Sequence, residues 1–344
     1  MLLACALALG AAACGGSEQH ASGAAAASTA GQASVTSAAT AATAVAPTPT
    51  IRATTTTTTS TKPAVAPPPS GPCGTLPVSP RRYAHVIWIW FENKTPPEVL
   101  GPTAHAPYLA ALAHGCGLAT NDHGVSHPTL PNLLAATSGS TQGIHGDGSP
   151  AIHALPDVPS LFGLAGSWRS YVEGMPAPCT LLDRPPLYAV RDNPAVYYGA
   201  IAGAACTDDV PLGPPSSGAL ARDLRGGTLP RFALISPDRC NDMHDCPVAT
   251  GDRWLSRFVP RILASRGYRA GRTAIFITWD ENPRYREPNR VALIAIAPGI
   301  PAGTTTGLSF DHYALLRTTE ELLGLRPLLG RAAHAPSLRA PLHL

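Results

Sequence analysis

Charged residues are scarce in this chain of 344 residues: Asp, Glu, Lys and Arg make up 14% of it, and the formal net charge is only +3. Nothing in the sequence suggests nucleic-acid binding, which would need a basic stripe, so we expect no nucleic-acid partner. The apolar run at residues 2–13 is too short to span a membrane. Paired C-x-x-C spacings are absent, which disfavours a cysteine-based zinc site, and no internal repeat is visible.

Glycine and proline are abundant instead, at 32 and 37 residues, so much of the chain must be loop or tether. Ala, Thr, Ser and Pro dominate residues 17–80. Such a composition cannot bury enough apolar surface to offset the entropy lost on ordering. We therefore expect a flexible, partly extended tether between the amino terminus and a folded domain.

The amino-terminal apolar run is typical of an export signal. Small residues at 11–13 precede Cys14, as in a bacterial lipoprotein cleavage site, which would make Cys14 the lipidated first residue of the mature protein. An ordinary signal peptide cut nearby is the alternative. We expect a signal peptide at 1–14, a disordered tether at 15–80 and a folded domain at 81–344. The protein is then extracellular or at the cell surface, with membrane contact only through a lipid on Cys14.

Cysteine usage agrees with export. Apart from Cys5 and Cys14, an even set of six remains, which predicts three disulfide bonds: Cys73, Cys116, Cys179, Cys206, Cys240 and Cys246. The shortest loop, between Cys240 and Cys246, is expected to be closed by one of them. The sequence leaves the pairing of the other four open.

Apolar runs alternate with helical patterns in the predicted domain. Strands are expected at 83–91, 117–121, 167–173, 231–236, 273–278 and 290–297, and helices at 105–114, 131–137, 160–166, 218–224, 252–266 and 312–324. This alternation predicts an α/β fold in which a mainly parallel sheet lies between helices on both faces. Asp252 is expected to cap the helix that starts with it.

The segment 126–132 places Thr129 between two prolines at the start of an expected helix. Pro131 suits the first turn of a helix, so the amides near Thr129 would lack internal partners and could attract an anion. A hydroxyl in that position can attack phosphorus if a metal ion lowers its pKa. The alternative is that Thr129 is only a helix N-cap.

Two acidic clusters follow apolar strands. Glu92 and Asn93 end the first predicted strand, and Asp280 and Glu281 follow the strand at 273–278. Adjacent carboxylates repel each other unless a cation lies beside them, so a metal ion is the simplest remedy. Loop caps at the strand ends are the alternative.

A third cluster crowds acids and a histidine, among them Asp242 and His244, into the loop 237–246. A purely structural loop rarely needs this composition. His312 opens the helix at 312–324, where it could be a metal ligand, a proton donor or only a helix-start residue.

These motifs together resemble the bacterial phosphoesterase family of acid phosphatases and phospholipases C. The resemblance covers residues 83–325, and five separated motifs occur in the family's order: Glu92-Asn93, His127 to Asn132, Pro237 to Cys246, Thr278 to Glu281 and His312 to Thr318. It implies the alkaline-phosphatase-like fold, a three-layer sandwich with metal and nucleophile at one edge of the sheet.

The resemblance also implies roles for these residues. Glu92, Asn93, Asp280 and Glu281 correspond to ligands of a divalent metal ion, whose identity it does not give, and Thr129 to the nucleophile. Four further residues would surround the phosphate or protonate the leaving oxygen: His127, Asp242, His244 and His312. The implied activity is that of an exported, metal-dependent acid phosphatase, with phospholipids and phosphoinositides among the candidate substrates. The alternatives are a phosphodiesterase of the phospholipase C type and a surface-binding domain without turnover.

Overall fold

The computed structural model describes residues 71–202, 206–283 and 288–344. The predicted signal peptide, the lipid site at Cys14 and residues 15–70 of the predicted tether lie outside the described residues. Within the described ranges, no helix is long and apolar enough to cross a membrane.

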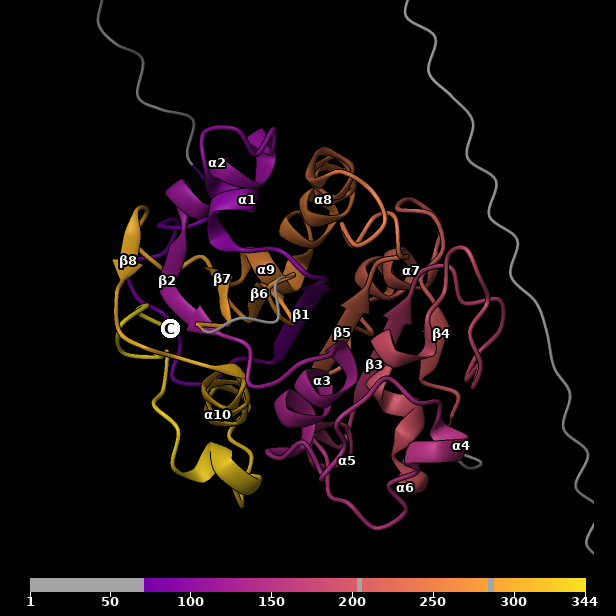
Figure 1. Ribbon diagram of the computed structural model, residues 1–344. Helices are drawn as coiled ribbons and strands as arrows, with labels where there is room; N and C mark the ends of the chain where they lie inside the picture. The colour runs from indigo at the N-terminus through magenta and orange to yellow at the C-terminus, as the bar shows by residue number, and fades with distance from the viewer. Residues whose placement is uncertain (1–70, 203–205, 284–287) are drawn as a thin grey trace, which may run out of the picture. The chain divides into compact units, whose positions relative to one another are not determined.

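The described strands form one eight-stranded sheet in the order β4-β3-β5-β1-β6-β7-β2-β8 (Figure 1). Seven run in the same direction, and β7 pairs antiparallel with both of its neighbours. Their bounds are β1 His85–Phe91, β2 Gly117–His123, β3 Trp168–Val172, β4 Asp209–Pro211, β5 Phe232–Ser236, β6 Thr273–Trp279, β7 Arg290–Ile296 and β8 Thr304–Thr306. The predicted α/β architecture is confirmed.

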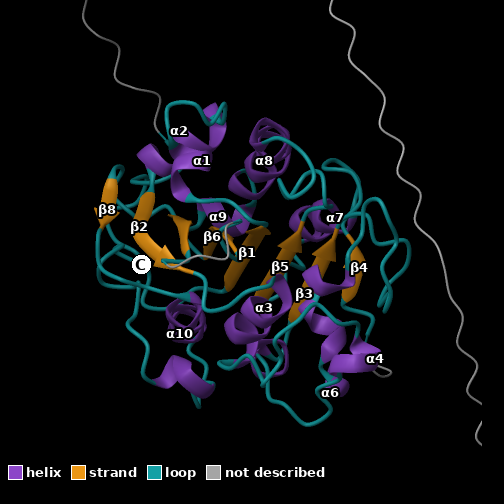
Figure 2. Ribbon diagram, in the orientation of Figure 1, coloured by secondary structure: helices purple, strands orange, loops and turns teal. Residues whose placement is uncertain are grey.

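Helices cover both faces of this sheet (Figures 1 and 2). One face carries α3 Thr129–Ser138, α5 Leu161–Ala165, α6 Gly199–Ala202 and α10 His312–Leu323. The other carries α1 Pro96–Leu100, α2 Pro107–Gly115, α7 Ala219–Gly226, α8 Val248–Leu263 and α9 Arg266–Arg269. The short α4 Pro150–His153 and the 3₁₀ helices η1 Val190–Asp192, η2 Pro194–Tyr197 and η3 Gly330–Ala333 lie in connecting segments.

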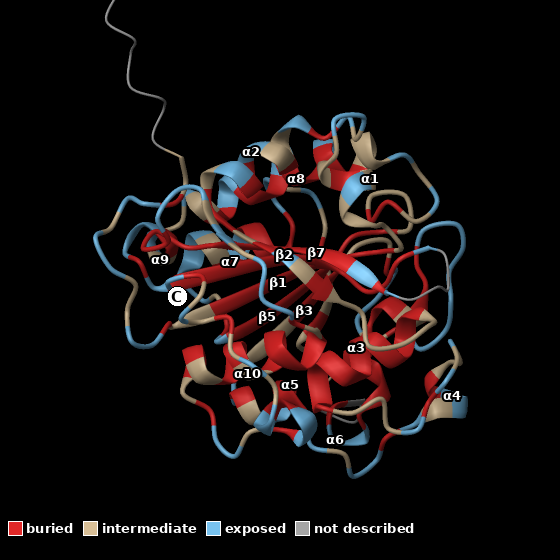
Figure 3. Cartoon of the chain, turned by 60° about the vertical axis from the view of Figure 1, so that its left-hand side comes forward, coloured by how far each residue is buried: buried red, intermediate tan, exposed pale blue. Residues whose placement is uncertain are grey.

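The central strands are buried from both sides, as Figure 3 shows. β1 and β6 are almost wholly apolar, and six of seven residues in β1 and all seven in β6 are buried. Strands covered on both faces need such continuous apolar runs, which explains why their positions were predicted from the sequence. The short edge strands β4 and β8 were not predicted, because three polar or mixed residues carry no strand pattern.

The predicted role of Asp252 is wrong. Helix α8 begins at Val248, so Asp252 lies inside it, on its buried side. The Asp252 carboxylate instead accepts hydrogen bonds from the backbone N–H groups of Tyr108 (3.3 Å) and Leu109 (2.7 Å) in the first turn of α2. Asp252 therefore caps α2 rather than its own helix. The N-cap residue of α2 is Ala106, whose side chain has no hydrogen-bond acceptor.

Residues 71–80, which the sequence assigned to the tether, contact the domain. Cys73 forms a disulfide with Cys116, and the Leu76 N–H donates to the carbonyl of Pro298 (3.0 Å). The folded domain thus includes residues before the predicted boundary at 81. The described residues contain two further disulfides, Cys179–Cys206 and Cys240–Cys246, so the predicted number and the one predicted pair are confirmed.

Asp252→Ala is expected to lower the free energy of unfolding by about 1–3 kcal/mol, because two buried N–H groups lose their acceptor. Asp252→Asn keeps an acceptor oxygen of the same size and should recover much of that loss. Chemical denaturation of both variants measures the difference. Equal unfolding free energies for the parent and the alanine variant would show that Asp252 does not hold α2.

Candidate active site

The carboxyl ends of the parallel strands meet at one edge of the sheet, and Thr129 lies there at the start of α3. Pro128, not Thr129, is the N-cap of α3, so the N-cap interpretation of Thr129 is wrong. The side chain of Thr129 is 2% exposed, and its hydroxyl donates to Glu92 Oε2 at 2.9 Å. The backbone N–H of Leu130, expected to be free for an anion, already donates to Asp147 Oδ1 at 2.9 Å. The Thr129 hydroxyl is therefore directed towards Glu92 at the end of β1, and it does not cap the helix to which Thr129 belongs.

Glu92 and Asp280 come together because β1 and β6 are neighbours in the sheet. Phe91 and Trp279 are paired in register, so the residues that follow them emerge side by side. Asn93 adopts a φ of 52°, a left-handed conformation that asparagine tolerates. Its N–H donates to Asp280 Oδ1 (2.9 Å) and its side-chain amide to Glu92 Oε2 (3.4 Å).

Three buried carboxylates around this point each keep one oxygen without a hydrogen-bond partner in the described part of the chain: Glu92 Oε1, Asp280 Oδ2 and Asp242 Oδ2. Burial, followed by repulsion from neighbouring acids, raises the pKa of Glu92 and of Asp242 well above the usual range. Burial also raises the pKa of Asp280 to about 7. The site is thus short of positive charge.

His127 and Glu281 form a pair beside these carboxylates, in which His127 Nδ1 contacts Glu281 Oε2. Burial and the nearby charge of Asp280 raise the pKa of Glu281 to about 9. Together the two side chains place an imidazole and an acid next to the first turn of α3.

His312 lies beneath the site, fully buried against Trp90 at a ring distance of 5.0 Å. Its Nε2 is 2.6 Å from the backbone carbonyl of Asp280, and because a carbonyl only accepts, Nε2 carries the proton. Burial lowers the pKa of His312 to about 4. The neutral ring therefore holds the backbone of Asp280 in place.

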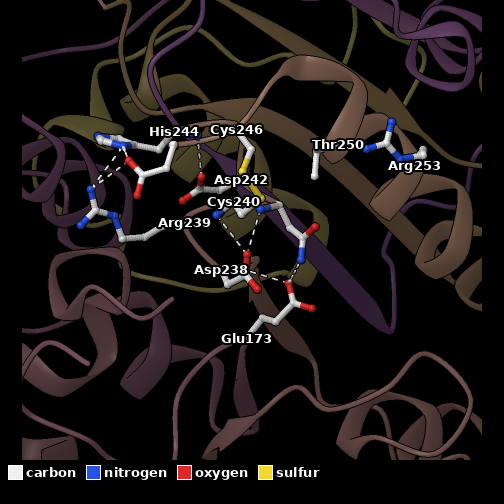
Figure 4. The surroundings of a disulfide bond; sticks show 11 residues. Glu173, Asp238, Arg239, Cys240, Asp242, His244, Cys246, Thr250 and Arg253 are labelled. Carbon is white, nitrogen blue, oxygen red and sulfur yellow. Dashed lines mark hydrogen bonds and ion pairs between the residues drawn. A yellow bond between two sulfur atoms is a disulfide. The ribbon is translucent and has the colours of Figure 1, made fainter. Parts of the chain in front are cut away.

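The loop between Cys240 and Cys246 brings Asp242 to the site (Figure 4). The Glu92 N–H donates to the Asp242 carbonyl (3.0 Å), and the Asp242 carboxylate accepts the His244 N–H (2.7 Å). The His244 imidazole instead pairs with Asp245 Oδ1 at 2.6 Å and with Arg239 Nη2 at 3.4 Å. Of the residues predicted for the site, Glu92 is hydrogen-bonded to Asn93, Thr129 and Asp242, and Asn93 to Asp280. The His244 imidazole pairs with side chains of its own loop instead.

Arg191 and Asp192 in η1 were not predicted for the site. Arg191 Nε lies 3.4 Å from Asp192 Oδ1 and 3.6 Å from Asp147 Oδ2. The other carboxylate oxygen of Asp147 accepts the Leu130 N–H in the first turn of α3. The Asp192 charge raises the pKa of Glu92, and that of Arg191 opposes it. Both residues lie in a long segment without periodicity, and the only available signal was an adjacent acid and base in a chain with little charge.

One group of three possible ligand side chains in the described residues has its ligand atoms within 4.8 Å of one another: Cys179, Cys206 and Asp209. Both sulfur atoms belong to a disulfide, so these residues form no metal site.

Two known proteins are similar in sequence to most of this chain. The phosphate-repressible acid phosphatase of Penicillium chrysogenum is 30% identical over 261 residues, which cover 72% of this chain and 61% of that protein. The phosphatidylinositol-3-phosphatase of Mycobacterium tuberculosis is 27% identical over 258 residues, covering 74% of this chain and 82% of that protein. The chain thus spans less than two thirds of the Penicillium relative.

Solved structures share the fold at low identity. A protein of the alkaline phosphatase superfamily from Vibrio parahaemolyticus matches 78% of this chain and 73% of its own, with a TM-score of 0.50 and 14% identity. The phosphonate monoester hydrolase of Agrobacterium radiobacter matches 76% of this chain and 77% of its own, with a TM-score of 0.52 and 12% identity. The predicted alkaline-phosphatase-like fold is confirmed.

The family model spans residues 89–326, a range that begins inside β1 and holds Thr129 and every carboxylate described above. Because it matches more than half of the chain, the protein belongs to the Phosphoesterase family.

Proposed function

We propose that this protein is an exported, metal-dependent acid phosphatase that hydrolyses phosphate monoesters through a phospho-threonine at Thr129. The observation that best supports this proposal is the hydrogen bond from the Thr129 hydroxyl to Glu92, beside buried carboxylate oxygens that lack partners among the described residues. The names of the relatives, both phosphatases, support this class of reaction.

The donor set fits a divalent cation. Oxygens of Glu92 and Asp280 without partners among the described residues are hard ligands that suit Mg²⁺, Ca²⁺ or Mn²⁺, and buried carboxylates that repel each other are stabilised by an added positive charge. Glu92, Asn93, Asp280 and Glu281 would hold the ion. When bound, such an ion lowers the pKa of a hydroxyl and neutralises phosphate oxygens.

Thr129 supplies the attacking oxygen in this proposal. Its Oγ1 forms the new bond to phosphorus while the ester P–O bond breaks and the alcohol leaves; water then attacks phosphorus, the Thr129–phosphate bond breaks, and inorganic phosphate is released. Glu92 Oε2 already accepts the hydrogen bond from Oγ1 at 2.9 Å, so it would take the Oγ1 proton as the new bond forms and return it when the phospho-threonine is hydrolysed.

His127 is the proposed proton donor to the leaving oxygen. It precedes Thr129 by two residues, and its ring contacts Glu281, an acid whose pKa is raised by burial. Asp242 and His244 complete the phosphate surroundings from the disulfide loop. His312 has a positioning role through the carbonyl of Asp280, since its one proton is already donated there.

The substrate and the location of the protein are further parts of the proposal. The name of the Mycobacterium relative makes phosphoinositides a candidate substrate class. The proposal also includes a signal peptide at 1–14, a lipid anchor at Cys14 and a tether between this anchor and the domain. Initial rates on p-nitrophenyl phosphate, a phosphoinositide and phosphatidylcholine separate the monoesterase from the phospholipase C alternative, and no turnover of any of them with any divalent ion would favour a binding domain.

Thr129→Ala is expected to lower kcat by roughly 10³-fold or more while phosphate still binds, because the attacking oxygen is lost. Thr129→Ser should keep activity, since it retains that oxygen. Acid quenching during turnover followed by mass spectrometry should find phosphate on the peptide that contains Thr129. Near-parental turnover by the alanine variant would mean that another group attacks phosphorus.

Asp280→Asn is expected to weaken Mn²⁺ binding by more than roughly 10-fold, which is what the loss of even an outer hydrogen-bond partner can cost. Thermal unfolding of the metal-free variant should match or exceed that of the parent, because one of several repelling carboxylates is removed. Calorimetric titration measures the affinity. Asp157→Asn removes an exposed acid elsewhere and should change neither value; unchanged Mn²⁺ affinity in Asp280→Asn would show that the metal site is misplaced.

Removing the Cys240–Cys246 bond with alanines is expected to cost activity before stability. The short loop contributes about 2 kcal/mol of unfolded-state entropy, against about 4 kcal/mol for the 43-residue separation of Cys73 and Cys116. The loop nevertheless orients Asp242, and catalytic geometry tolerates little drift. Steady-state kinetics and unfolding of the two double variants should therefore rank in opposite orders. A Cys240/Cys246 variant with parental kcat/KM would contradict this.

A further inference from the structure

Eight exposed arginines cover α7, α8, α9 and the turn before β6: Arg222, Arg225, Arg253, Arg257, Arg261, Arg266, Arg269 and Arg272. We call them the arginine surface. The acids in the same stretches, 219–227 and 248–272, are Asp223 and Asp252, and both are buried. Asp223 is bound by Arg169, and Asp252 caps α2. The arginine surface therefore carries no exposed negative charge in those stretches.

The spacing of these arginines places them side by side. Arg253, Arg257 and Arg261 recur every four residues, which puts them on one face of α8. Helices α7 and α9 both contact α8 (Figure 1). Two adjoining hollows of about 380 and 590 Å³ lie between these helices, and between them they are lined by Arg225, Arg257, Arg261, Arg266 and Arg269. None of the eight arginines forms an ion pair with another described residue.

Helix α8 runs from the disulfide loop towards α9, so Arg253 lies near that loop (Figure 4), whereas Arg261, Arg266, Arg269 and Arg272 lie towards the end of the sheet opposite the candidate active site. Helix α9 leads into the amino end of β6, whereas Asp280 follows its carboxyl end. A strand of seven residues separates the two ends by roughly 23 Å. Arg261, Arg266, Arg269 and Arg272 are therefore too far from Thr129 to contact a phosphate there.

The chain enters the domain at this same end. The hydroxyl of Tyr268 in α9 donates to the carbonyl of Pro72 at 2.6 Å. The 70 residues that precede Gly71, including the expected export and anchor segment, thus join the domain beside the arginine surface.

We propose that the arginine surface docks on an anionic lipid bilayer. Guanidinium groups bind phosphate oxygens through paired N–H donors. The cations are spread over three helices and two hollows instead of converging on one point, which suits a surface of many headgroups better than a single soluble anion. The chain enters the domain beside these arginines, at Pro72, so an anchor that precedes the domain would keep them within reach of a bilayer. This inference does not depend on the proposed phosphatase activity.

Vesicle flotation with the full chain tests the proposal, with Cys14→Ser to remove any acyl group. We expect the protein to float with vesicles that contain phosphatidylglycerol and not with phosphatidylcholine alone. The triple variant Arg257→Gln/Arg261→Gln/Arg269→Gln should bind roughly 100-fold more weakly, since each arginine near such a surface contributes about fivefold. Its thermal unfolding midpoint and circular dichroism spectrum should match those of the parent, which shows that it is folded.

Two controls make the result specific. Arg184→Gln/Arg290→Gln/Arg331→Gln removes the same charge from exposed positions on other elements and should leave binding near the parental level. Lysine at 257, 261 and 269 keeps the charge and should retain most of the binding. The proposal is overturned if the glutamine variant at 257, 261 and 269 binds like the parent, if neutral vesicles bind equally well, or if the parent binds soluble polyphosphate but not anionic vesicles.

Discussion

Repulsion among buried carboxylates at the carboxyl edge of one parallel sheet is the constraint on which the rest of this structure depends. Glu92 and Asp280 emerge from neighbouring strands, and Asp192 and Asp242 act on them from two loops. Apolar strands cannot neutralise this charge, and Arg191 offsets only part of it. A site of this kind is costly for folding unless positive charge is added, and this cost is the reason why we propose a metal ion here.

The scaffold holds these acids through backbone groups rather than through opposite charges. The Asn93 N–H binds Asp280, the Asp242 carbonyl accepts the Glu92 N–H, and His312 binds the Asp280 carbonyl. Backbone contacts fix the positions of the carboxylates and leave one oxygen of each free of protein partners in the described residues. The Cys240–Cys246 bond restricts the loop that carries Asp242 in the same way. The carboxylates are thus held in place while one oxygen of each remains available as a ligand.

Charge is also divided between the two ends of the sheet. Acids gather where the parallel strands end. Eight of the 25 Lys and Arg residues gather on α7 to α9 and the turn before β6, and four of them, Arg261, Arg266, Arg269 and Arg272, lie towards the opposite end. A net charge of +3 hides this separation, because the two groups nearly cancel in the sum. The proposals for chemistry and for location rest on different residues, so they can be tested independently.

The sequence by itself determined the α/β alternation, the six longer strands, the family and the local motifs around Glu92, Thr129 and Asp280, because long apolar runs and strand-end acids are local signals. Only the tertiary structure decided that Asp252 caps α2 and that the Thr129 hydroxyl points at Glu92. It also decided that Arg191 and Asp192 join the site, and that arginines from three helices share one surface. Each of these results depends on contacts between segments far apart in the chain, for which hydrophobic periodicity carries no information.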